Sequence, residues 1–524
     1  MPFAITLMAR LAKEGLSTAK DLILAWSKKG PDIFPEHHEQ NINRSISLSI
    51  DSKLMKKNPQ ARLLLDILSF LPAGTTKATL RWWVPSLDSS MVPSAIATLF
   101  KTGLLVENQR QDSDSPVLFV LPVVQSFMQQ HGRIGKEIRQ NVQLSCSQYV
   151  LDHRQNSPSA FVSESNWKAL VAEDVNIHAI LCGPPTMQDS NMLSDKVIQA
   201  LVSFSWYRCI DAKPNLEVAK HAMSMTKAFG NMKYIASSLW CLGRTYDVLG
   251  EFYAAYDNLQ EAYQLYNALL SGDRELQWLC CECGIDMVNV ARLTFKDGDD
   301  KLVSLARDVE KQAATISDDY IHAKSLVMLG KVMVDFGDQQ EALRYLERAK
   351  LMRFGDSLRS EVYFWIAHVY YHEKRLPEAL DAAEEAWKLS EPDNDMVNQA
   401  LFSLLLCRIL FSANRDTEAW KFMEISLTMN LELGNRRDSA RTLEYMGYGY
   451  LRKGDYLNAY GAYEAAVESY LGTVDEEPDG TTCKDNMSKI KDMLKNPDLN
   501  IGFKRPRHDN DYPSLYYPSA AASV

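Results

Sequence analysis

The sequence lacks any apolar run of about 18 or more residues, so it predicts no membrane-spanning helix. Its first stretch, MPFAITLMARLAKEG, is briefly apolar, but Arg10 and Lys13 follow the apolar residues, whereas the basic residues of a signal peptide precede them. The nine cysteines are scattered, several of them within apolar helical patterns, which is typical of reduced and buried thiols. These absences predict an intracellular, cytoplasmic protein.

Several catalytic and cofactor-binding motifs are missing as well. The sequence has no G-x-S-x-G turn for a nucleophile, no paired Asp-rich metal motif and no dinucleotide-binding G-x-G-x-x-G after a strand. The phosphate loop G-x-x-x-x-G-K-S/T is absent too. The nearest string, Gly132 to Glu137, has the wrong spacing and places Glu137 where a hydroxyl is needed. We therefore expect no enzymatic activity, no bound cofactor and no metal.

An excess of positive charge is also absent. The chain has 57 Lys and Arg against 67 Asp and Glu, a net charge of -10. Nucleic-acid binders usually carry a basic face or stripe, so dedicated nucleic-acid binding is disfavoured. The chain of 524 residues is too long for one core, and this length predicts about three domains.

What the sequence does contain is a repeated pattern of paired helices in its second half. In four units a small residue lies inside an apolar helix, a turn follows, and a second helix carries two alanines seven positions apart. Small residues recur where two helices approach closely, so the pattern predicts stacked helical hairpins, an α-α superhelix, over residues 191–472. The markers are Gly243, Gly330, Ala367 and Gly447 in the first helices, and Ala255, Ala342, Ala379 and Ala459 with Ala262, Ala349, Ala386 and Ala466 in the second.

The repeats extend beyond these four units. Marker positions step by about forty residues from Gly330 to Gly447. The interval between Gly243 and Gly330 fits two units, the second of which, around LCCECGIDMVNVARLTF, is degenerate. An earlier unit around Trp206, Tyr207 and Ala219 brings the expected number of helix pairs to six or seven.

Residues 41–132 show a different order of elements. The segments PQARLLLDILSFL, TKATLRWWV and PSAIATLFKTG predict helices, the last of them capped by Gly103. Two short strands, LLVEN and PVLFVLP, follow around a turn-rich loop. Three helices and a two-stranded hairpin are the order of a winged helix. Its expected recognition helix, PSAIATLFKTG, has one cation, Lys101, so we expect it to be buried against neighbouring domains rather than bound to DNA.

Two family resemblances add to this interpretation. The helix pairs resemble the tetratricopeptide pattern, with a period longer than the usual thirty-four residues. The segment MPFAITLMARLA, through Pro2, Phe3 and Ala4, looks like the element that closes the NB-ARC module of STAND signalling ATPases. Together with LLLDILSFLP, the winged helix and the repeats, it is similar to fungal NB-ARC–tetratricopeptide (NLR-like) proteins. The resemblance implies a switch that exchanges ADP for ATP and uses the repeats as a sensor.

The chain departs from that family at two places. It has no phosphate loop, and the Met-His-Asp triplet of many relatives falls here at Leu121-Pro122-Val123, which offers neither a hydrogen-bond donor nor a carboxylate. ATPase chemistry is therefore not expected in this polypeptide. The sequence corresponds either to a diverged, lone C-terminal part or to a gene product whose upstream half is missing.

Two clusters of metal-ligand residue types have plainer explanations. His368 and His372 lie four residues apart on one helix, but Glu373 follows the second histidine, which is the wrong order for His-Glu-x-x-His. We expect them in an exposed, ligand-facing patch or in ordinary packing. The cluster of Cys280, Cys281 and Cys283 has no matching second pair, so buried thiols are favoured over a metal site.

The register of the repeats predicts which residues gather on the concave face. Aromatic residues and arginines often anchor protein interfaces, and this mixture suits an acidic, partly apolar peptide or protein tail. A generic solvated face is the alternative. If the face binds a partner, charge reversal at Arg408 and Arg441 should abolish capture without changing thermal stability. The predicted protein-binding residues are Trp240, Arg244, Lys331, Phe364, His368, Tyr371, Arg408, Arg441, Tyr448 and Arg452.

Three functional hypotheses remain open from the sequence: an interaction and regulatory protein that binds a protein or peptide, a fragment of a STAND switch, and a winged-helix transcription regulator. The expected organisation is an NB-ARC remnant and linker over residues 1–40, a winged-helix-like domain over 41–132, a helical connector over 133–190, the repeats over 191–472 and a mostly disordered tail over 473–524 that includes a short helix, SKIKDMLK.

Overall fold

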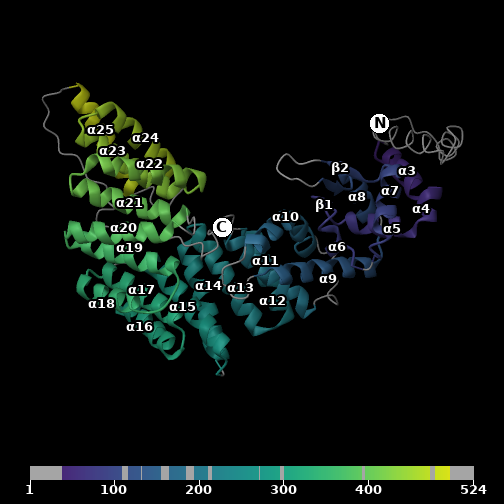
Figure 1. Ribbon diagram of the computed structural model, residues 1–524, viewed down its shortest axis with the longest axis horizontal. Helices are drawn as coiled ribbons and strands as arrows, with labels where there is room; N and C mark the ends of the chain where they lie inside the picture. Colours follow the sequence, from purple (N-terminus) through teal and green to yellow (C-terminus); the bar gives the residue numbers. More distant parts are fainter. Residues whose placement is uncertain are drawn as a thin grey trace. The chain divides into compact units, whose positions relative to one another are not determined.

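The computed structural model describes residues 38–85, 87–108, 116–130, 133–154, 164–183, 194–210, 215–270, 272–294, 300–391, 396–471 and 478–495. The chain divides into two compact units (Figure 1). Unit 1 comprises residues 1–156 and 162–205, and unit 2 comprises residues 157–161 and 206–524. Most of the NB-ARC remnant and linker predicted over residues 1–40 lies outside the described part, as do residues 496–524 of the predicted disordered tail. Residues 478–495 of that tail form a helix instead, longer than the predicted SKIKDMLK helix. No helix among the described residues has both the length and the apolar content needed to cross a membrane.

Unit 1 contains short helices around a small antiparallel sheet. The strand order is β1-β3-β2, with Thr76 opposite Val117 and Glu107 opposite Leu118. The predicted helices and the predicted hairpin are confirmed as elements, and β1 was not predicted. The elements are α3 (His38–Ile50), α4 (Lys53–Lys57), α5 (Pro59–Leu68), β1 (Thr75–Thr76), α6 (Leu80–Trp83), α7 (Val92–Thr102), β2 (Val106–Asn108), β3 (Val117–Phe119), α8 (Pro122–Gln130), α9 (Lys136–His153) and α10 (Glu164–Leu181).

Helix α10 is fixed to the turn that leads into β1. The Asn176 side chain accepts a hydrogen bond from the Ala73 amide (3.0 Å) and donates one to the Gly74 carbonyl (2.7 Å). Gly74 has a φ of +70° and lies where a Cβ would be 2.5 Å from the Leu118 carbonyl oxygen, so only glycine fits. The buried Glu173 carboxylate accepts a hydrogen bond from the Thr75 hydroxyl (3.1 Å). Buried polar groups with partners of this kind orient two elements rigidly.

Helix α7 ends as predicted, with Gly103 in the left-handed conformation at φ +74°. The expectation that this helix is buried against neighbouring domains is wrong for one of its faces. The side that packs on α4 and α5 is buried, whereas Pro93, Ser94, Ala97 and Lys101 are exposed. The exposed face is therefore short, and Lys101 is its single cation among the described residues.

Asp66 of α5 provides a pH-dependent test of the unit 1 core. Its carboxylate accepts a hydrogen bond from Arg62 (3.0 Å), but burial dominates and raises its pKa from 3.8 to about 6. A carboxyl group whose pKa is higher in the folded than in the unfolded state stabilises the fold fully below the unfolded pKa. This stabilisation is lost as the pH rises through the folded pKa. We expect the stability of the wild type relative to Asp66→Asn to fall between about pH 4 and pH 6. Urea unfolding of both chains at each pH measures the difference; a constant difference would contradict the assignment.

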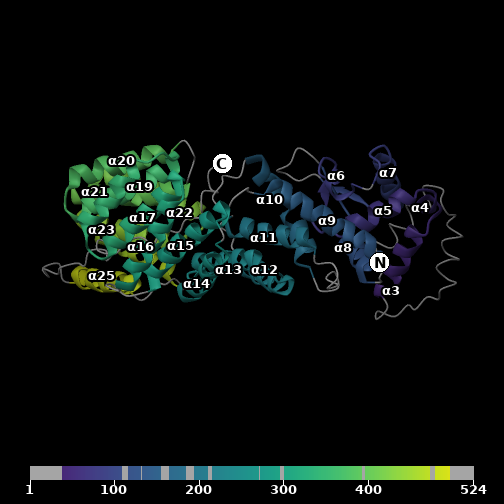
Figure 2. The ribbon, with the colours of Figure 1, turned by 90° about the horizontal axis from the view of Figure 1, so that it is seen from below.

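Unit 2 is a stack of helical hairpins (Figures 1 and 2), so the predicted α-α superhelix is confirmed. Each hairpin packs on the next, and the first helices of successive hairpins also contact one another. Helix α11 spans the boundary between the units. The helices are α11 (Asp195–Ile210), α12 (Leu216–Phe229), α13 (Met232–Val248), α14 (Phe252–Leu269), α15 (Arg274–Thr294), α16 (Asp300–Thr315), α17 (Asp319–Asp335), α18 (Gln339–Lys350), α19 (Asp356–His372), α20 (Leu376–Ser390), α21 (Met396–Ser412), α22 (Asp416–Glu432), α23 (Arg436–Arg452), α24 (Tyr456–Tyr470) and α25 (Pro478–Lys495).

The small marker residues lie where the two helices of a hairpin cross. A Cβ added at Gly243 would be 2.7 Å from Leu259, and one at Gly330 would be 2.9 Å from Leu346. Gly284 has the same role in the degenerate unit, where Val309 of α16 would be 3.0 Å from its Cβ. The two helices approach so closely at these positions that only a small residue fits. The predicted reason for the small residues of the repeat is therefore confirmed.

The turns of the hairpins use left-handed residues. Gly250, Gly337 and Gly454 have φ values of +81°, +76° and +75° at the predicted turns, where glycine adopts this conformation without strain. Lys374 and Asn414 take the same role in the α19–α20 and α21–α22 hairpins, with φ values of +60° and +58°. These two turns lack the glycine of the other turns, but their backbone has the same left-handed conformation.

Candidate functional site

We call the surface formed by α13, α15, α17, α19, α21 and α23 the first-helix face. Buried ion pairs connect its helices. Asp286 of α15 accepts hydrogen bonds from Trp240 Nε1 (2.8 Å) and Arg244 Nη1 (3.0 Å) of α13. Glu282 of the same helix binds Lys324 of α17. These contacts tie three successive hairpins together through charged groups that are largely removed from water.

The next contacts surround Trp365 of α19, which is fully buried. Arg292 binds Asp335, and Lys331 binds Glu361, so α15, α17 and α19 are joined in turn. The Arg292 guanidinium and the Lys331 ammonium each lie 5.5 Å from the Trp365 ring centroid, within cation–π range. Burial lowers the pKa of Lys331, although the Glu361 carboxylate opposes this shift.

A pocket lies on the first-helix face between α19, α21 and α23. Its centre has about 10 Å³ of free volume, which is room for about one water molecule. The accessible lining of the pocket is almost entirely apolar, and the pocket brings together four of the ten predicted binding residues. Its lining consists of Phe364, His368, Leu401, Leu404, Leu405, Arg408, Arg441 and Tyr445.

Arg408 lies among aromatic rings at this pocket. Its guanidinium carbon is 5.3 Å from the Tyr371 ring centroid and 5.6 Å from that of Tyr445. His368 is fully buried, and burial, followed by the charge of Arg408, holds its pKa well below the ordinary range. His368 is therefore a neutral imidazole at pH 7, and Arg408 carries the positive charge of this side of the pocket.

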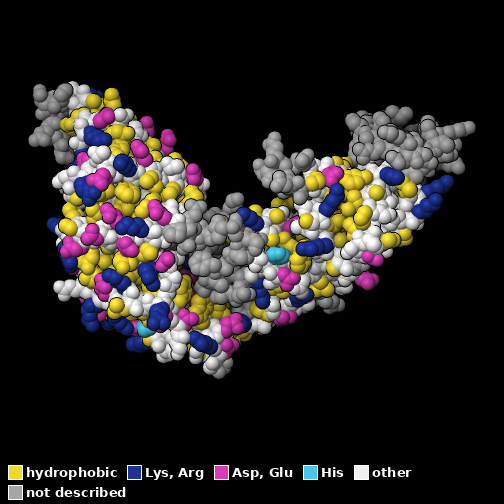
Figure 3. Space-filling view, viewed as in Figure 1, with side chains coloured by type: hydrophobic (Ala, Val, Ile, Leu, Met, Phe, Trp, Pro, Cys, Tyr) yellow, Lys and Arg dark blue, Asp and Glu magenta, His cyan; other side chains and the backbone are white. Residues whose placement is uncertain are grey.

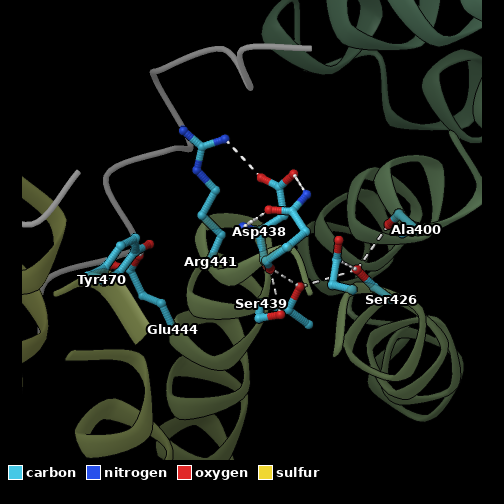
Figure 4. A network of polar contacts seen from close by, with 10 residues as sticks. Ala400, Ser426, Asp438, Ser439, Arg441, Glu444 and Tyr470 are labelled. Atoms are coloured by element: carbon cyan, nitrogen blue, oxygen red, sulfur yellow. Dashed lines mark hydrogen bonds and ion pairs between the residues drawn. The ribbon is translucent and has the colours of Figure 1, made fainter. Parts of the chain in front are cut away.

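Arg441 supplies the second guanidinium, and Figure 4 shows its side chain extending away from α23. Its Nη1 lies 3.3 Å from Asp438 Oδ1, one helical turn earlier. Glu444, on the following turn, accepts a hydrogen bond from Tyr470 (3.1 Å) of α24. These neighbouring contacts hold the polar side chains of α23 in place around Arg441.

A hydroxyl network fixes α23 against the preceding hairpin. The Ser426 hydroxyl of α22 donates a hydrogen bond to the Ala400 carbonyl of α21 (2.9 Å), and it lies 3.2 Å from the Thr442 hydroxyl (Figure 4). Ser426 and Thr442 are both fully buried. The polar groups around the pocket are therefore held at a defined position between α21, α22 and α23.

The structure corrects the expected exposure of the predicted binding residues. Trp240, Lys331, Phe364, His368, Arg408 and Arg441 are all buried. Arg244 is mostly buried in its pair with Asp286, and Tyr371 and Tyr448 are half-buried. Arg452 donates hydrogen bonds to the Phe411 carbonyl (2.8 Å) and to Asn414 (2.9 Å) at the end of α21.

Charge reversal at Arg408 and Arg441 can no longer be expected to leave stability unchanged. The two residues are 4% and 3% exposed, so a carboxylate at either position would be buried beside aromatic or acidic neighbours. The binding role of the ten residues stays a prediction. Four lining residues were missed: Leu401, Leu404, Leu405 and Tyr445. A charged Arg408 inside the apolar run LFSLLLCRILF was the available signal for them.

The remaining clusters are structural. Cys280, Cys281 and Cys283 are buried, as predicted, and burial raises the pKa of Cys280 and Cys281 to about 12, so they are unreactive thiols. The rings of His368 and His372 have centroids 6.1 Å apart. Within the described residues, no group of three or more His, Cys, Asp or Glu side chains is arranged to hold a metal ion.

No family model matches the sequence. No curated protein matches it either. Solved structures of helical-repeat proteins are similar to it at low identity. The STAND protein with a tetratricopeptide repeat sensor from Pyrococcus horikoshii is 14% identical, with 94% of this chain and 69% of that chain covered and a TM-score of 0.35. The aspartyl phosphate phosphatase F from Bacillus subtilis is 11% identical (81% and 95% covered, TM-score 0.42).

A Rap protein complexed with competence and sporulation factor is 12% identical to this chain, with 69% of this chain and 92% of that chain covered and a TM-score of 0.38. All three TM-scores are below 0.5, so these similarities carry no argument about function. None of them supports the fungal, NB-ARC or winged-helix parts of the resemblance drawn from the sequence.

Proposed function

We propose that the chain is an intracellular interaction and regulatory protein whose helical repeats bind a protein or peptide ligand on the first-helix face. The observation that carries this proposal is the pocket between α19, α21 and α23, where two arginines meet aromatic and leucine side chains. Arginine and aromatic residues supply most of the binding energy at protein interfaces. The proposed ligand is therefore acidic and partly apolar.

The electrostatics of the pocket favour a carboxylate. Removing a guanidinium from water costs free energy that an incoming carboxylate offsets, and hydrogen bonds between charged groups are stronger than neutral ones. A guanidinium has five N–H donors, so Arg408 and Arg441 can bind a ligand while keeping contacts such as the one between Arg441 and Asp438. The leucines of α21 supply an apolar part of the same lining.

Neutralising the arginines tests this proposal. A peptide selected on the full chain from a library of acidic and aromatic sequences is titrated by fluorescence anisotropy. We expect Arg408→Gln or Arg441→Gln to weaken its binding about 10- to 100-fold, because each removes charge-assisted hydrogen bonds. Arg415→Gln, at an exposed Arg415–Glu418 pair, is the matched control and should bind like the wild type.

Folding of the variants must be measured alongside binding, because Arg408 and Arg441 are buried. Circular dichroism shows whether each variant keeps its helices at the titration temperature. If folded Arg408→Gln and Arg441→Gln chains bind the peptide as tightly as Arg415→Gln does, the pocket is not the binding site.

The element order of unit 1 supports a winged-helix fold, since α5, β1, α6 and α7 precede the β2–β3 hairpin. We do not extend this to DNA binding, because the exposed face of α7 carries only Lys101 among the described residues and the repeats in view mix basic with acidic side chains (Figure 3). Duplex binding that weakens steeply with salt would favour a transcription regulator instead.

A second candidate function rests on the sequence resemblance carried by MPFAITLMARLA: the chain would be the C-terminal part of an ATP- and ADP-switched STAND protein. An in-frame phosphate loop encoded upstream of residue 1 would support it. Isothermal calorimetry with ADP on the chain tests nucleotide binding directly, and we expect none from this polypeptide, which lacks the phosphate loop.

A further inference from the structure

We propose that Asp247 is a proton-binding group that makes the stability of the hairpins from α13 to α17 depend on pH. Asp247 lies near the end of α13, beside the ion pairs that join α13, α15 and α17. A proton added there on acidification stabilises this part of the stack. The device concerns the regulation of the repeats, and it depends neither on the pocket nor on the ligand proposed above.

The cluster around these ion pairs holds more carboxylates than cations. Arg244 binds Asp286, and Lys324 binds Glu282, so each of these two cations already has a carboxylate partner. Asp247 is a third carboxylate next to Arg244 and Asp286. Its side chain is half-buried, and it forms no hydrogen bond and no direct ion pair with any described residue. Asp247 therefore brings a negative charge that its contacts do not offset.

The neighbouring Glu282 shows the same shortage of partners. Its Oε2 accepts a hydrogen bond from Lys324, whereas its Oε1 is buried and accepts none from the described residues. Burial raises the pKa of Glu282, and the charge of Asp286 adds to this shift. The two cations of the cluster therefore do not fully compensate even their direct partners, and they leave little compensation for Asp247.

The groups around Asp247 leave its neutral form favoured. Burial has the largest effect and raises its pKa from 3.8 to about 6. Arg244 of the same helix opposes this rise, Asp286 of α15 supports it, and Arg437 of α23 opposes it more weakly. The other charged or titratable groups nearby are Cys209 of α11, Lys220 of α12, which lies against the adjacent Tyr246 ring, and Glu251 at the start of α14.

The sign of the effect follows from linkage. The folded pKa of Asp247 lies above its unfolded value, so its contribution to stability is complete below the unfolded pKa and is lost as the pH rises through the folded pKa. With values of about 6 and 3.8, the folding equilibrium constant of this part of the stack should be about tenfold larger at pH 5 than at pH 7. Carboxylates with strong partners have the opposite effect, because acid removes their stabilising charge.

Hydrogen exchange read by mass spectrometry tests the proposal on the full chain, because it resolves the opening of individual helices. The opening constants of α13, α15 and α17 are measured at pH 5 and pH 7 and corrected for intrinsic exchange rates. We expect the ratio of these constants between the wild type and Asp247→Asn to be about tenfold lower at pH 5 than at pH 7. The matched control, Asp257→Asn, removes an exposed carboxylate of α14 and should keep the pH dependence of the wild type. Equal ratios at both pH values would overturn the proposal.

Carbon-13 NMR of the chain labelled at its aspartate carboxyl carbons measures the protonation directly. The signal that disappears in Asp247→Asn should titrate with a midpoint near pH 6. Arg437→Gln should move this midpoint upward, because it removes a charge that favours the ionised form, and this shift also identifies the signal if Asp247→Asn does not fold. A midpoint near pH 4, as in an unfolded chain, overturns the proposal. A midpoint near pH 6 without any change of exchange in α13, α15 and α17 overturns it as well, because the proton would then not stabilise the stack.

Discussion

Replacing Glu361 with leucine should lower the free energy of unfolding of the helical repeats by about 3–5 kcal/mol, because it removes the partner of a buried charge. Glu361 and Lys331 have side chains that are 9% and 4% exposed. Without the carboxylate, the Lys331 ammonium stays between α17 and α19 beside Trp365 and the Arg292 guanidinium. Urea unfolding followed by circular dichroism measures the loss.

The pH dependence of this variant has a defined sign. Burial already lowers the pKa of Lys331, and the loss of Glu361 removes the group that opposed this shift. A lysine whose folded pKa lies below its unfolded value makes stability rise with pH between the two values, because the unfolded state binds more protons. The destabilisation by Glu361→Leu should therefore become smaller as the solution is made alkaline.

Two controls separate this explanation from a general loss of packing. The double variant Lys331→Met, Glu361→Leu removes both charges, so it should recover most of the lost stability. Glu275→Leu breaks the Lys233–Glu275 pair, which also joins two successive first helices but is 40% and 67% exposed, and it should cost no more than about 1 kcal/mol. Equal losses at Glu361 and Glu275 would show that the Lys331–Glu361 pair is solvated.

Gly447→Val is expected to destabilise the repeats by about 2–3 kcal/mol, because the position has no room for a side chain. Its Cβ would be 2.9 Å from Cε1 and Cζ of Tyr463, a fully buried ring of α24. A rigid ring cannot bend away as the end of an aliphatic side chain can, so α23 and α24 would have to separate. Thermal and urea unfolding measure the change.

Gly461→Ala, in the same hairpin, should have the opposite sign. Gly461 is exposed on α24 and has no atom within 4 Å of its Cβ position. Alanine restricts the unfolded chain and favours the helix, so stability should rise by about 0.5–1 kcal/mol. Both glycines lie in helices, so helix propensity alone predicts a gain at each. A gain at Gly447 would contradict the close contact between α23 and α24.

The sequence predicted the hairpins well because their markers act locally. Gly330 and Ala342 report the crossing of two helices that follow each other in the chain, and the left-handed turn at Gly337 lies between them. The same kind of signal placed Gly103 at the end of α7. This turn signal was weaker at Lys374 and Asn414, which replace glycine, because the residue type does not reveal their left-handed conformation.

The candidate site was only partly predictable. The register of the repeat placed Phe364, His368, Arg408 and Arg441 on one face, and the structure brings them together. The register did not reveal that these side chains are buried, because it describes one hairpin at a time. Contacts such as Asn176 with Gly74, 102 residues apart, have no sequence signature at all.

By itself, then, the sequence determined which residues pair within each hairpin, because small residues and turns act over a few helical turns of one chain segment. Only the tertiary structure decided which charges are buried and which meet at the pocket. Those outcomes depend on how α19, α21 and α23 pack against one another, and a buried charge must be compensated by neighbouring groups instead of by water.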